Sequence, residues 1–320
     1  MSTSSWLNSE MNRLRKIWPS FLGFLLFALS IWAISQKLER YSIQDVLSSL
    51  SNIPKTHQSG AIFLMLISYL MTTGYDVLAF SYIGFPLHYG KIAYGAFISY
   101  AISNNIGLSI LTGSALRYRI YSGWRVPAGV IAQVIAFANL TFWLGLFGVC
   151  GFVFLFTPLQ IPSILDLPFV SVRPIGIIFL LTIGIYLLWS SFNHQPLKLG
   201  DWELNFPTVG LSLALIAFAL FDWGAAGGVL YLLLPAGSTS SYLSCFSIYL
   251  LAMTASMISS IPGGLGVFET VVLTLVSAEA NPAEVLGALL AYRAIYYLLP
   301  LIVATLLLGI HEIKKQGSFY

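Results

Sequence analysis

Long apolar runs separated by short polar segments dominate the sequence and predict membrane-spanning helices. Each run is about 20 residues or longer, which is enough to cross a hydrocarbon layer of about 30 Å at helical rise. Full spans are predicted at residues 18–36, 59–86, 127–157, 174–192, 208–234 and 283–312. Residues 41–53 carry apolar residues at helical spacing with polar residues between them, which predicts a short helix at the membrane interface.

Two further apolar runs are interrupted by residues that disfavour a continuous helix. Residues 90–112 contain Ser103, Asn104 and Asn105, and residues 240–281 contain a Ser-Ser-Ile-Pro-Gly-Gly segment that begins at Ser259. Backbone that leaves helical geometry at membrane depth must be buried in protein or line a wet cavity, because lipid cannot satisfy its N–H and C=O groups. Each run is therefore predicted to be a helical hairpin with a break in its middle.

The positions of lysine and arginine favour hairpins that re-enter the membrane over full spans. If residues 90–112 cross fully, the basic residues other than Arg293 divide seven and seven between the two sides. If residues 90–112 enter from the cytoplasm and residues 240–281 enter from the other side, ten lie inside and four outside, as the positive-inside rule predicts. The ten are residues 13, 15, 16, 91, 117, 119, 125, 198, 314 and 315, and the four are 37, 40, 55 and 173. Both termini are then cytoplasmic.

This threading arranges the chain as an inverted repeat within one membrane domain, residues 1–320. Residues 1–17 are the cytoplasmic N-terminus, residues 18–157 form the first half with hairpin 90–112, and residues 174–312 form the second half with hairpin 240–281. Tyr75 and Asp76 in the second span are echoed by Phe221 and Asp222 in its later counterpart. Inverted repeats with broken helices are a transporter architecture. The alternative is a chance echo in an apolar chain.

The composition excludes a soluble globular protein. Of the 320 residues, 58% are hydrophobic and 8% are charged, whereas soluble domains are about 25% charged. A β-barrel would need segments of about 10 residues with alternating polarity, and the runs here are continuous. The net charge of +3 is too small to predict nucleic-acid binding. Cys150 and Cys245 lie in apolar runs and predict neither a disulfide nor a metal site.

Four ionisable residues are predicted within the membrane: Asp76, Asp222, Glu269 and Arg293. A charged group there costs about 2.5–3.5 kcal/mol on insertion scales, so each is expected to face a partner or water. Together they could form one polar centre for transport. The alternative is that Arg293 pairs with one carboxylate only to hold helices together.

Arg117, Tyr118 and Arg119 follow the first predicted hairpin and suit a phosphate diester. Guanidinium groups present planar N–H forks to phosphate oxygens, and aromatic rings are common at headgroup depth. An anionic lipid headgroup is the ligand that fits this cluster. The alternative is an ordinary cytoplasmic positive anchor, because short cytoplasmic loops are rich in arginine and lysine.

The segment that contains Gly263, Gly264, Gly266 and Glu269 is the most distinctive in the chain. A helix that restarts at about Gly266 would direct N–H groups and its positive end into the membrane interior, where they attract an anion. Glu269 would stabilise that helix end without a ligand, or act as a proton-sensitive gate. Asn104 and Asn105 would supply polar groups at the first break. The alternative for the glycines is close helix packing.

No enzyme motif is present in the sequence. There is no H-E-x-x-H, no G-x-S-x-G and no P-loop, and the four histidines are far apart. We therefore expect no catalytic residues, no metal and no cofactor.

Several segments together resemble a known family. These are Tyr75–Asp76, Gly113–Tyr121, Ile261–Glu269 and Leu290–Pro300, and they are similar to the transmembrane region of lysylphosphatidylglycerol synthases, most closely to its stand-alone YbhN-like branch. The resemblance extends from about residue 20 to residue 312. It implies a bacterial inner-membrane protein with a flippase-like fold, which in the fused members moves aminoacylated phosphatidylglycerol between leaflets. Only eight residues follow Glu312, so we expect this chain not to make lysyl-lipid by itself.

The leading functional prediction is a lipid translocator for an anionic, phosphatidylglycerol-like phospholipid or a related phosphodiester lipid. Arg117 and Arg119 would capture the headgroup at the cytoplasmic face, and Asp76, Asp222, Glu269 and Arg293 would line the middle of the path. One alternative is a secondary transporter of a small anion. Another is a scaffold that does not transport and instead binds a lipid-modifying enzyme. The protein partner that these hypotheses imply is a second copy of the chain, in a homo-oligomer, or a lipid-modifying enzyme.

Overall fold

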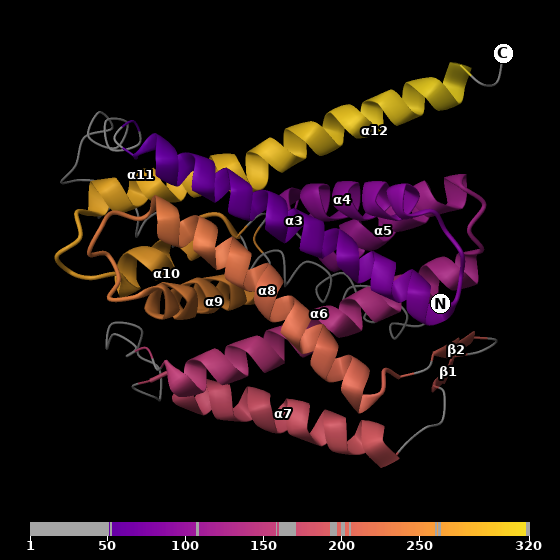
Figure 1. Cartoon of the computed structure of the whole chain (residues 1–320), viewed down its shortest axis with the longest axis horizontal. Helices are drawn as coiled ribbons and strands as arrows, with labels where there is room; N and C mark the ends of the chain where they lie inside the picture. The colour runs from indigo at the N-terminus through magenta and orange to yellow at the C-terminus, as the bar shows by residue number, and fades with distance from the viewer. Residues whose placement is uncertain are drawn as a thin grey trace, which may run out of the picture.

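The chain folds into packed helices joined by short connections (Figure 1). The computed structural model describes residues 51–317, apart from residues 52, 107–108, 158, 160–170, 193–196, 200–201, 205, 260 and 262–263. Its helices are α3 (Lys55–Ile83), α4 (Tyr89–Ile106), α5 (Ser109–Gly123), α6 (Ala128–Phe156), α7 (Arg173–Phe192), α8 (Val209–Leu233), α9 (Tyr242–Ser259), α10 (Val267–Leu275), α11 (Pro282–Tyr292), the π-helical segment η3 (Arg293–Leu298) and α12 (Leu299–Gly317). Between α7 and α8, strands β1 (Leu197–Leu199) and β2 (Trp202–Leu204) pair antiparallel, which the sequence analysis did not predict.

Six of the described helical stretches are long and apolar enough to cross a membrane. They are α3, α6, α7, α8, α9 and the stretch Pro282–Leu308 that runs through α11, η3 and α12. Five of these match predicted spans, and the sixth, α9, is the first arm of the predicted second hairpin. The predicted span at residues 18–36 and nearly all of the predicted helix at residues 41–53 lie outside the described residues. The prediction of an all-α polytopic membrane protein is confirmed.

The surface of α7 shows that lipid is the solvent of this fold. Leu181 is 60% exposed, Ile185 68% and Phe192 84%. Contiguous exposed apolar faces of this kind are rare on proteins that live in water and mark an interaction or membrane surface. α7 packs on α6, where Gly176 lies against the backbone of Gly151, and it also contacts α8; among the described residues, its exposed apolar side chains are turned away from the protein and suit contact with acyl chains.

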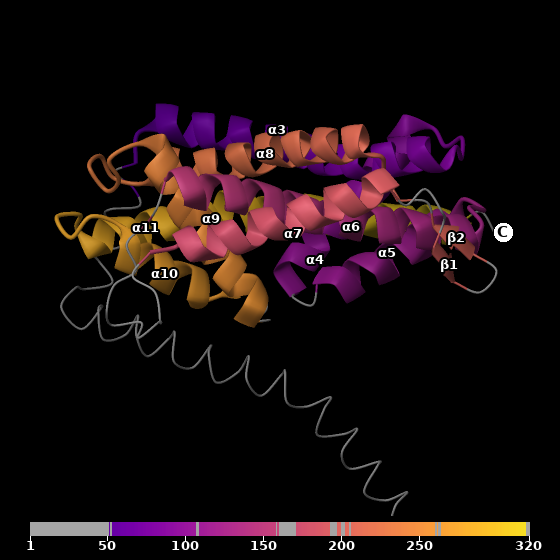
Figure 2. The ribbon, with the colours of Figure 1, turned by 90° about the horizontal axis from the view of Figure 1, so that it is seen from below.

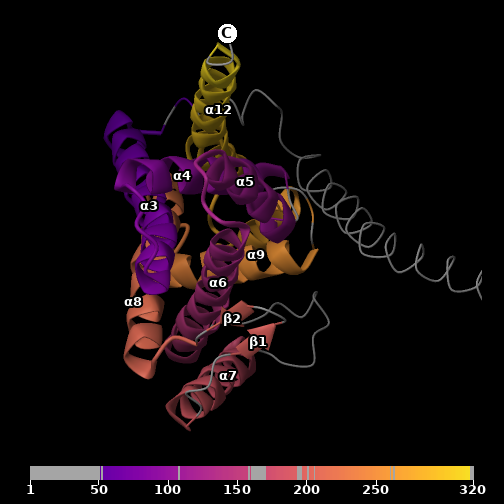
Figure 3. The same cartoon turned by 90° about the vertical axis from the view of Figure 1, so that its right-hand side faces the viewer.

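The two halves of the chain repeat one order of helix contacts. In the first half α3 packs on α4, α4 on α5 and α5 on α6; in the second α8 packs on α9, α9 on α10 and α10 on α11. The halves also exchange their last helices, since α12 packs on α4 and α6 packs on α9. α3 and α8 lie side by side and join the halves (Figure 3). The two halves therefore share one packing order, and the inverted orientation of one half stays a prediction.

The two helical hairpins occupy opposite ends of the long axis of the molecule. Figures 1 and 2 show α4 and α5 toward one end, with α9 and α10 toward the other. Each hairpin packs on the long helix that precedes it, α3 for the first and α8 for the second. Such a placement suits hairpins that enter from opposite sides of a membrane, and that orientation stays a prediction.

Close packing between α6 and α8 fixes the position of α8. A Cβ atom added at Gly145 would lie 2.6 Å from Cβ of Ala219, and one added at Gly148 would lie 2.6 Å from Ile216. Small residues allow helices in membranes to approach closely enough for van der Waals contacts to hold them. Gly145 and Gly148 of α6 therefore allow the stretch of α8 that contains Asp222 to pack closely on α6.

The first hairpin breaks later in the chain than the sequence suggested. Ser103, Asn104 and Asn105 belong to α4, which extends to Ile106, and α5 begins at Ser109. The Ser103 hydroxyl donates to the carbonyl of Tyr100 and the Asn105 amide to that of Ala101, so these polar groups are satisfied within helical geometry. The segment with Arg117 then forms the second arm, α5, and not a loop after the hairpin.

A π-helical turn, η3, interrupts the last predicted span directly at Arg293. Pro300 follows it and has no amide hydrogen, so the helix loses a backbone donor there. Nearby carbonyls accept from side chains of other helices: that of Tyr296 from the Tyr69 hydroxyl at 3.2 Å, and that of Tyr297 from the Asn105 amide at 3.3 Å. The irregular turn therefore ties the last span to α3 and α4. Single π-helical turns are frequent at functional sites.

Candidate functional site

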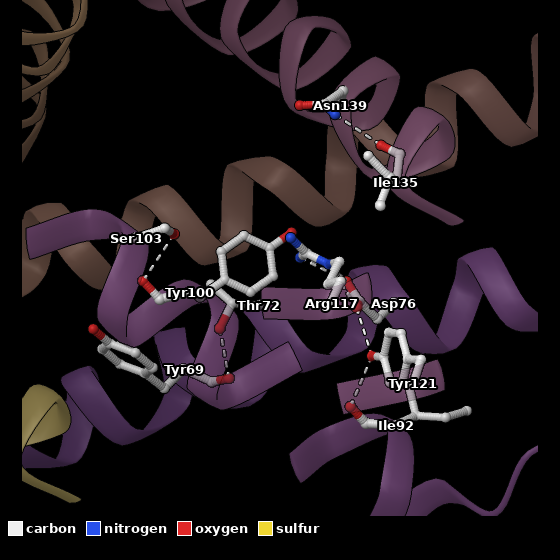
Figure 4. Close-up of polar contacts among 10 residues, drawn as sticks. All are labelled: Tyr69, Thr72, Asp76, Ile92, Tyr100, Ser103, Arg117, Tyr121, Ile135 and Asn139. Atoms are coloured by element: carbon white, nitrogen blue, oxygen red, sulfur yellow. Dashed lines mark hydrogen bonds and ion pairs between the residues drawn. The ribbon is translucent and has the colours of Figure 1, made fainter. Parts of the chain in front are cut away.

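Asp76 of α3 and Arg117 of α5 form a buried ion pair. The Arg117 Nε donates to Oδ2 of Asp76 at 2.9 Å and its Nη2 donates to Oδ1 at 2.9 Å, so the contact is bidentate. The Tyr121 hydroxyl adds a third hydrogen bond, 2.7 Å from Oδ2. Asp76 is fully buried and Arg117 is 6% exposed. Figure 4 shows the three side chains pointing toward one another from the two helices.

Aromatic rings and glycines complete the surroundings of this pair. The guanidinium of Arg117 lies 4.5 Å from the ring centre of Tyr100, where the face of the ring attracts a cation. A Cβ atom at Gly95 would come within 2.5 Å of the Tyr121 ring, so glycine makes room for that tyrosine. Removing one partner of a buried pair leaves an uncompensated charge and costs about 3–5 kcal/mol. The site holds both charges only as a pair.

Glu269 of α10 and Arg293 of η3 form a second buried ion pair. The Arg293 Nε donates to Oε1 of Glu269 at 2.7 Å, and its Nη2 donates to the carbonyl of Gly264 at 3.2 Å. Oε2 of Glu269 accepts from the amide of Gly266 at 2.8 Å, which caps the start of α10. Gly264 and Gly266 have φ values of 60° and 83°, in the left-handed region that favours glycine.

The second arginine is also set among aromatic rings. The Arg293 guanidinium lies 4.7 Å from the ring centre of Tyr297 and 5.5 Å from that of Phe268. Beside or within each hairpin there is thus one buried arginine that is paired with a carboxylate and stacked on a tyrosine. The two pairs differ in their source, because Arg117 comes from the hairpin itself and Arg293 from the span that follows the hairpin.

Asp222 of α8 is buried without an arginine. Its Oδ1 accepts from the Ser68 hydroxyl at 2.6 Å and its Oδ2 from the Tyr75 hydroxyl at 3.1 Å. Ser68 also hydrogen-bonds to the Tyr296 hydroxyl at 2.8 Å. Asp222 is 3% exposed, and within the described part of the chain no basic residue forms an ion pair with it. Both hydroxyl partners of Asp222 come from α3, and Tyr296 of η3 is connected to it through Ser68.

Hydroxyls and rings connect the three carboxylates. Tyr75, which binds Asp222, is next to Asp76 in the chain, and its ring lies 6.4 Å from that of Tyr100. On the other side, the ring of Tyr292 stacks between those of Tyr296 and Phe268, at 5.4 Å from each. A buried polar and aromatic path therefore runs from the first pair, past Asp222, to the second.

The structure brings some of the predicted residues together and separates others. Asp76, Arg117, Glu269 and Arg293 form two pairs, and Asp222 lies between them, so the charges do not form one centre around Arg293. Arg117 points into the protein, whereas Tyr118 and Arg119 are exposed. The three residues do not form a single clamp.

The remaining predicted residues lie near the breaks. The side-chain amide of Asn105 donates to the carbonyl of Tyr297, and the side chain of Asn104 lies near the Tyr69 hydroxyl. Gly264 and Gly266 shape the second pair, and Gly263 lies outside the described residues. The anion expected at the start of α10 is the carboxylate of Glu269 itself.

Sequence reasoning missed the neutral partners of these charges. Tyr121 binds Asp76, Ser68 and Tyr75 bind Asp222, and Tyr296 binds Ser68. A signal for part of this set exists in α3, where Ser68, Thr72 and Tyr75 recur at helical spacing in an otherwise apolar span. Such a polar stripe marks the face of a membrane helix that is turned toward protein.

An apolar groove lies where α6 of the first half meets α8 and α9 of the second half. It has a volume of about 280 Å³, and it is formed by α6, α8 and α9. Phe152, Phe156, Leu220, Leu243 and Phe246 supply most of its apolar lining. Phe152 and Phe156 are 57% and 66% exposed, so the groove opens toward the acyl chains of a bilayer.

The protein has several membrane-spanning helices, and two charged pairs are buried next to its hairpins. Its class is therefore a polytopic membrane protein with a polar interior. The comparison with known families agrees and is more specific. The family described as the lysylphosphatidylglycerol synthase TM region matches residues 20–304, and the chain belongs to this family.

Individual relatives cover nearly the whole chain. The uncharacterized protein slr0712 of Synechocystis sp. is 50% identical over 304 residues, which is 95% of this chain and 94% of the relative. The inner membrane protein YbhN of Escherichia coli is 28% identical over 295 residues, 91% of either chain. The phosphatidylglycerol lysyltransferase of Staphylococcus aureus is 24% identical over 308 residues, which cover 94% of this chain but 35% of that protein.

Proposed function

We propose that the protein moves an anionic phospholipid, or a related phosphodiester lipid, between the leaflets of a bacterial inner membrane. The family supports a membrane role, and relatives that include an inner membrane protein and a phosphatidylglycerol lysyltransferase support a lipid substrate. The observation that carries the proposal is the presence of one buried arginine–carboxylate pair at each hairpin.

These pairs provide a way to accept an anionic headgroup without leaving a charge alone. Arg117 is bound by a planar carboxylate in two-point geometry, and a phosphate diester offers the same two oxygens. When a lipid enters, its phosphate replaces Asp76 on the guanidinium. When the lipid leaves, Asp76 returns. Because the carboxylate competes for the same N–H groups, it both neutralises the empty site and helps to release the lipid.

The second pair offers the same exchange nearer the other end of the molecule. Arg293 is held by Glu269, and the amide of Gly266 is held by the other oxygen of that carboxylate. If the carboxylate moves away, the guanidinium and the start of α10 both become donors for a phosphate. A headgroup would pass from Arg117 to Arg293 along the polar path that contains Asp222.

Exposed groups suit the entry step and the acyl chains. Arg119, two residues after the buried Arg117, is exposed, and Tyr118 between them is 53% exposed. Arg119 would attract the headgroup before Arg117 binds it. The apolar groove between α6, α8 and α9 lets acyl chains stay in the bilayer while the headgroup crosses.

The test is leaflet exchange in proteoliposomes that contain phosphatidylglycerol with a fluorescent acyl chain. A membrane-impermeant quencher removes the outer-leaflet signal in protein-free vesicles. We expect further quenching with the wild-type protein and none with an Arg117→Ala/Arg119→Ala variant. Arg173→Ala, which removes an exposed arginine at the start of α7, is the matched control and should exchange lipid normally.

Three outcomes would contradict the proposal. Unchanged exchange by a well-folded double variant would remove the arginines from the mechanism. Uptake of a soluble anion without lipid exchange would favour the small-anion transporter. No exchange by the wild type, with or without an imposed pH gradient, would favour the scaffold.

A further inference from the structure

The three buried carboxylates differ in the kind of hydrogen-bond partner that holds them. Both oxygens of Asp76 accept from Arg117, and the oxygens of Glu269 accept from Arg293 and from a backbone amide. Oδ2 of Asp76 also accepts from the Tyr121 hydroxyl, so what these two carboxylates share is an arginine partner. The oxygens of Asp222 accept from the hydroxyls of Ser68 and Tyr75.

This difference decides which carboxylate can gain and lose a proton in place. Asp76 and Glu269 each neutralise a buried guanidinium, so a proton on either carboxylate would leave that arginine without its counter-charge. A hydroxyl can donate or accept. If Asp222 takes a proton on Oδ2, it can donate to the Tyr75 oxygen. If the proton is on Oδ1, Ser68 can accept it and turn its own hydrogen toward Tyr296, 2.8 Å away.

In the described residues, the ionisable side chains that interact with Asp222 are tyrosines of α3, α4, α9 and η3. They are Tyr69 and Tyr75 of α3, Tyr100 of α4, Tyr249 of α9 and Tyr296 of η3. The other ionisable side chains of the helices packed on α8 have no hydrogen bond or ion pair to Asp222 in the described residues; they are Lys55, His57, Asp76 and Tyr82 of α3, Cys150 of α6, Arg173 and Tyr186 of α7, Tyr242 and Cys245 of α9, and Glu284 and Tyr292 of α11. No cation among the described residues is therefore paired with Asp222.

We propose that Asp222 is a proton-binding site, and that its protonation couples a proton gradient to the movement of the headgroup past it. This proposal deepens the proposed lipid translocation and rests on it for the coupling step only. The carboxylate takes one proton from the aqueous phase on one side, becomes a neutral acid, and returns the proton to the other side. In the neutral form it does not repel the phosphate that passes from Arg117 to Arg293. In the charged form it favours release.

Infrared difference spectroscopy of the full-length protein in nanodiscs tests the site without any transport assay. Exposed carboxyls are ionised above about pH 6, so a carboxyl C=O band that appears between pH 9 and about pH 6 reports a buried group. We expect this band in the wild type and in Glu284→Gln, which removes an exposed carboxyl of α11. We expect the band to be absent in Asp222→Asn, whose amide retains the shape of the side chain.

A second variant, Ser68→Ala, retains the carboxyl of Asp222, so it tests the site even if Asp222→Asn fails to fold. This variant removes one of the two hydroxyl partners, so the C=O band should persist and move to a higher frequency, as a less hydrogen-bonded carbonyl does. A band that is absent in the wild type, or that is unchanged in frequency by Ser68→Ala and still present in Asp222→Asn, would overturn the proton site.

Leaflet exchange at two pH values separates failure of this proposal from failure of lipid translocation. We expect exchange that accelerates with an imposed pH gradient in the wild type and does not respond to it in Asp222→Asn. A titrating band without any lipid exchange would retain the proton site and reject the lipid substrate. Exchange with the same gradient response in both proteins would retain the lipid substrate and reject the coupling.

Discussion

The two halves of the protein share one helical framework but use their embedded aspartates differently. In the first half Asp76 of α3 is bound by Arg117, which comes from the second arm of the adjacent hairpin. In the second half Asp222 occupies the corresponding long helix, but the second arm, α10, contains no arginine or lysine. The arginine of that half, Arg293, comes from η3 and binds Glu269 instead.

This difference teaches that a repeat can conserve helix packing while it redistributes charge. Two of the carboxylates are bound by arginine, and the third accepts from hydroxyls, which can hydrogen-bond to a carboxylate or to a carboxylic acid. A strictly symmetric molecule would have two equal sites facing opposite ways. In our proposal, this asymmetry supplies two arginines that bind the anion and, between them, one carboxylate that gains and loses a proton.

The largest expected effect comes from separating the first pair. Asp76→Ala leaves the guanidinium of Arg117 buried without a counter-charge, and we expect a loss of about 3–5 kcal/mol in the free energy of unfolding. Reversible unfolding in mixed micelles measures it. The double variant Asp76→Leu/Arg117→Met should recover much of this stability, since apolar replacements of a buried pair are often tolerated. Equal losses in the single and double variants would show that the pair is not the cause.

A substitution in the contact between α6 and α8 should have an intermediate effect on stability. In Gly145→Ala the new methyl group would meet Cβ of Ala219 at 2.6 Å, so α6 and α8 must move apart, at a cost of about 1–3 kcal/mol. Gly184→Ala in α7 is the matched control, because nothing lies within 4 Å of the added Cβ. The control should be neutral or slightly stabilising, since alanine has the higher helix propensity. Thermal unfolding of both variants checks this prediction.

Asp222→Asn should lower the free energy of unfolding by less than Asp76→Ala or Gly145→Ala does. It removes no counter-ion and keeps an oxygen that can accept from Ser68 or Tyr75, so we expect a loss of about 1 kcal/mol or less in the free energy of unfolding. The same unfolding measurement applies. A loss as large as that of Asp76→Ala would mean that Asp222 compensates a buried positive charge, and the contrast between the halves would fail.

The smallest effect on stability is expected at Arg119. The side chain is exposed, so Arg119→Ala should change the free energy of unfolding by less than about 0.5 kcal/mol. Lipid exchange should nevertheless slow, most at low ionic strength, because salt screens the attraction between an exposed guanidinium and a headgroup. Initial exchange rates at two salt concentrations measure this, and a rate equal to that of Arg173→Ala would exclude an entry role.

Much of the fold was predictable because lipid imposes simple requirements on sequence. Helical rise and bilayer thickness fix the lengths of spans, so runs such as residues 127–157 and 208–234 match α6 and α8 closely. The end of α4, at Ile106, was predicted too early in the chain for a local reason. Serine and asparagine disfavour helices in water, but at Ser103 and Asn105 they donate to carbonyls of their own helix.

The charged members of the site were also predictable, and their partners were not. A charge in an apolar run is visible in a sequence, whereas the choice between Asp76, Asp222 and Glu269 as the partner of an arginine depends on how helices cross. Arg117 was expected in a cytoplasmic loop because basic residues cluster there. Its burial follows from Gly113, Arg117 and Tyr121 sharing one face of α5, a helical spacing that the cluster of charges obscured.

The most direct test of the exchange mechanism is leaflet exchange by Asp76→Asn in the same phosphatidylglycerol proteoliposomes as the wild type. Arg117 would then have no competing carboxylate, so lipid should still bind and co-purify but should not be released. The account predicts quenching beyond the outer leaflet for the wild type and quenching of the outer leaflet alone for Asp76→Asn. Exchange by Asp76→Asn at the wild-type rate would contradict it, because the carboxylate would then have no part in moving the lipid.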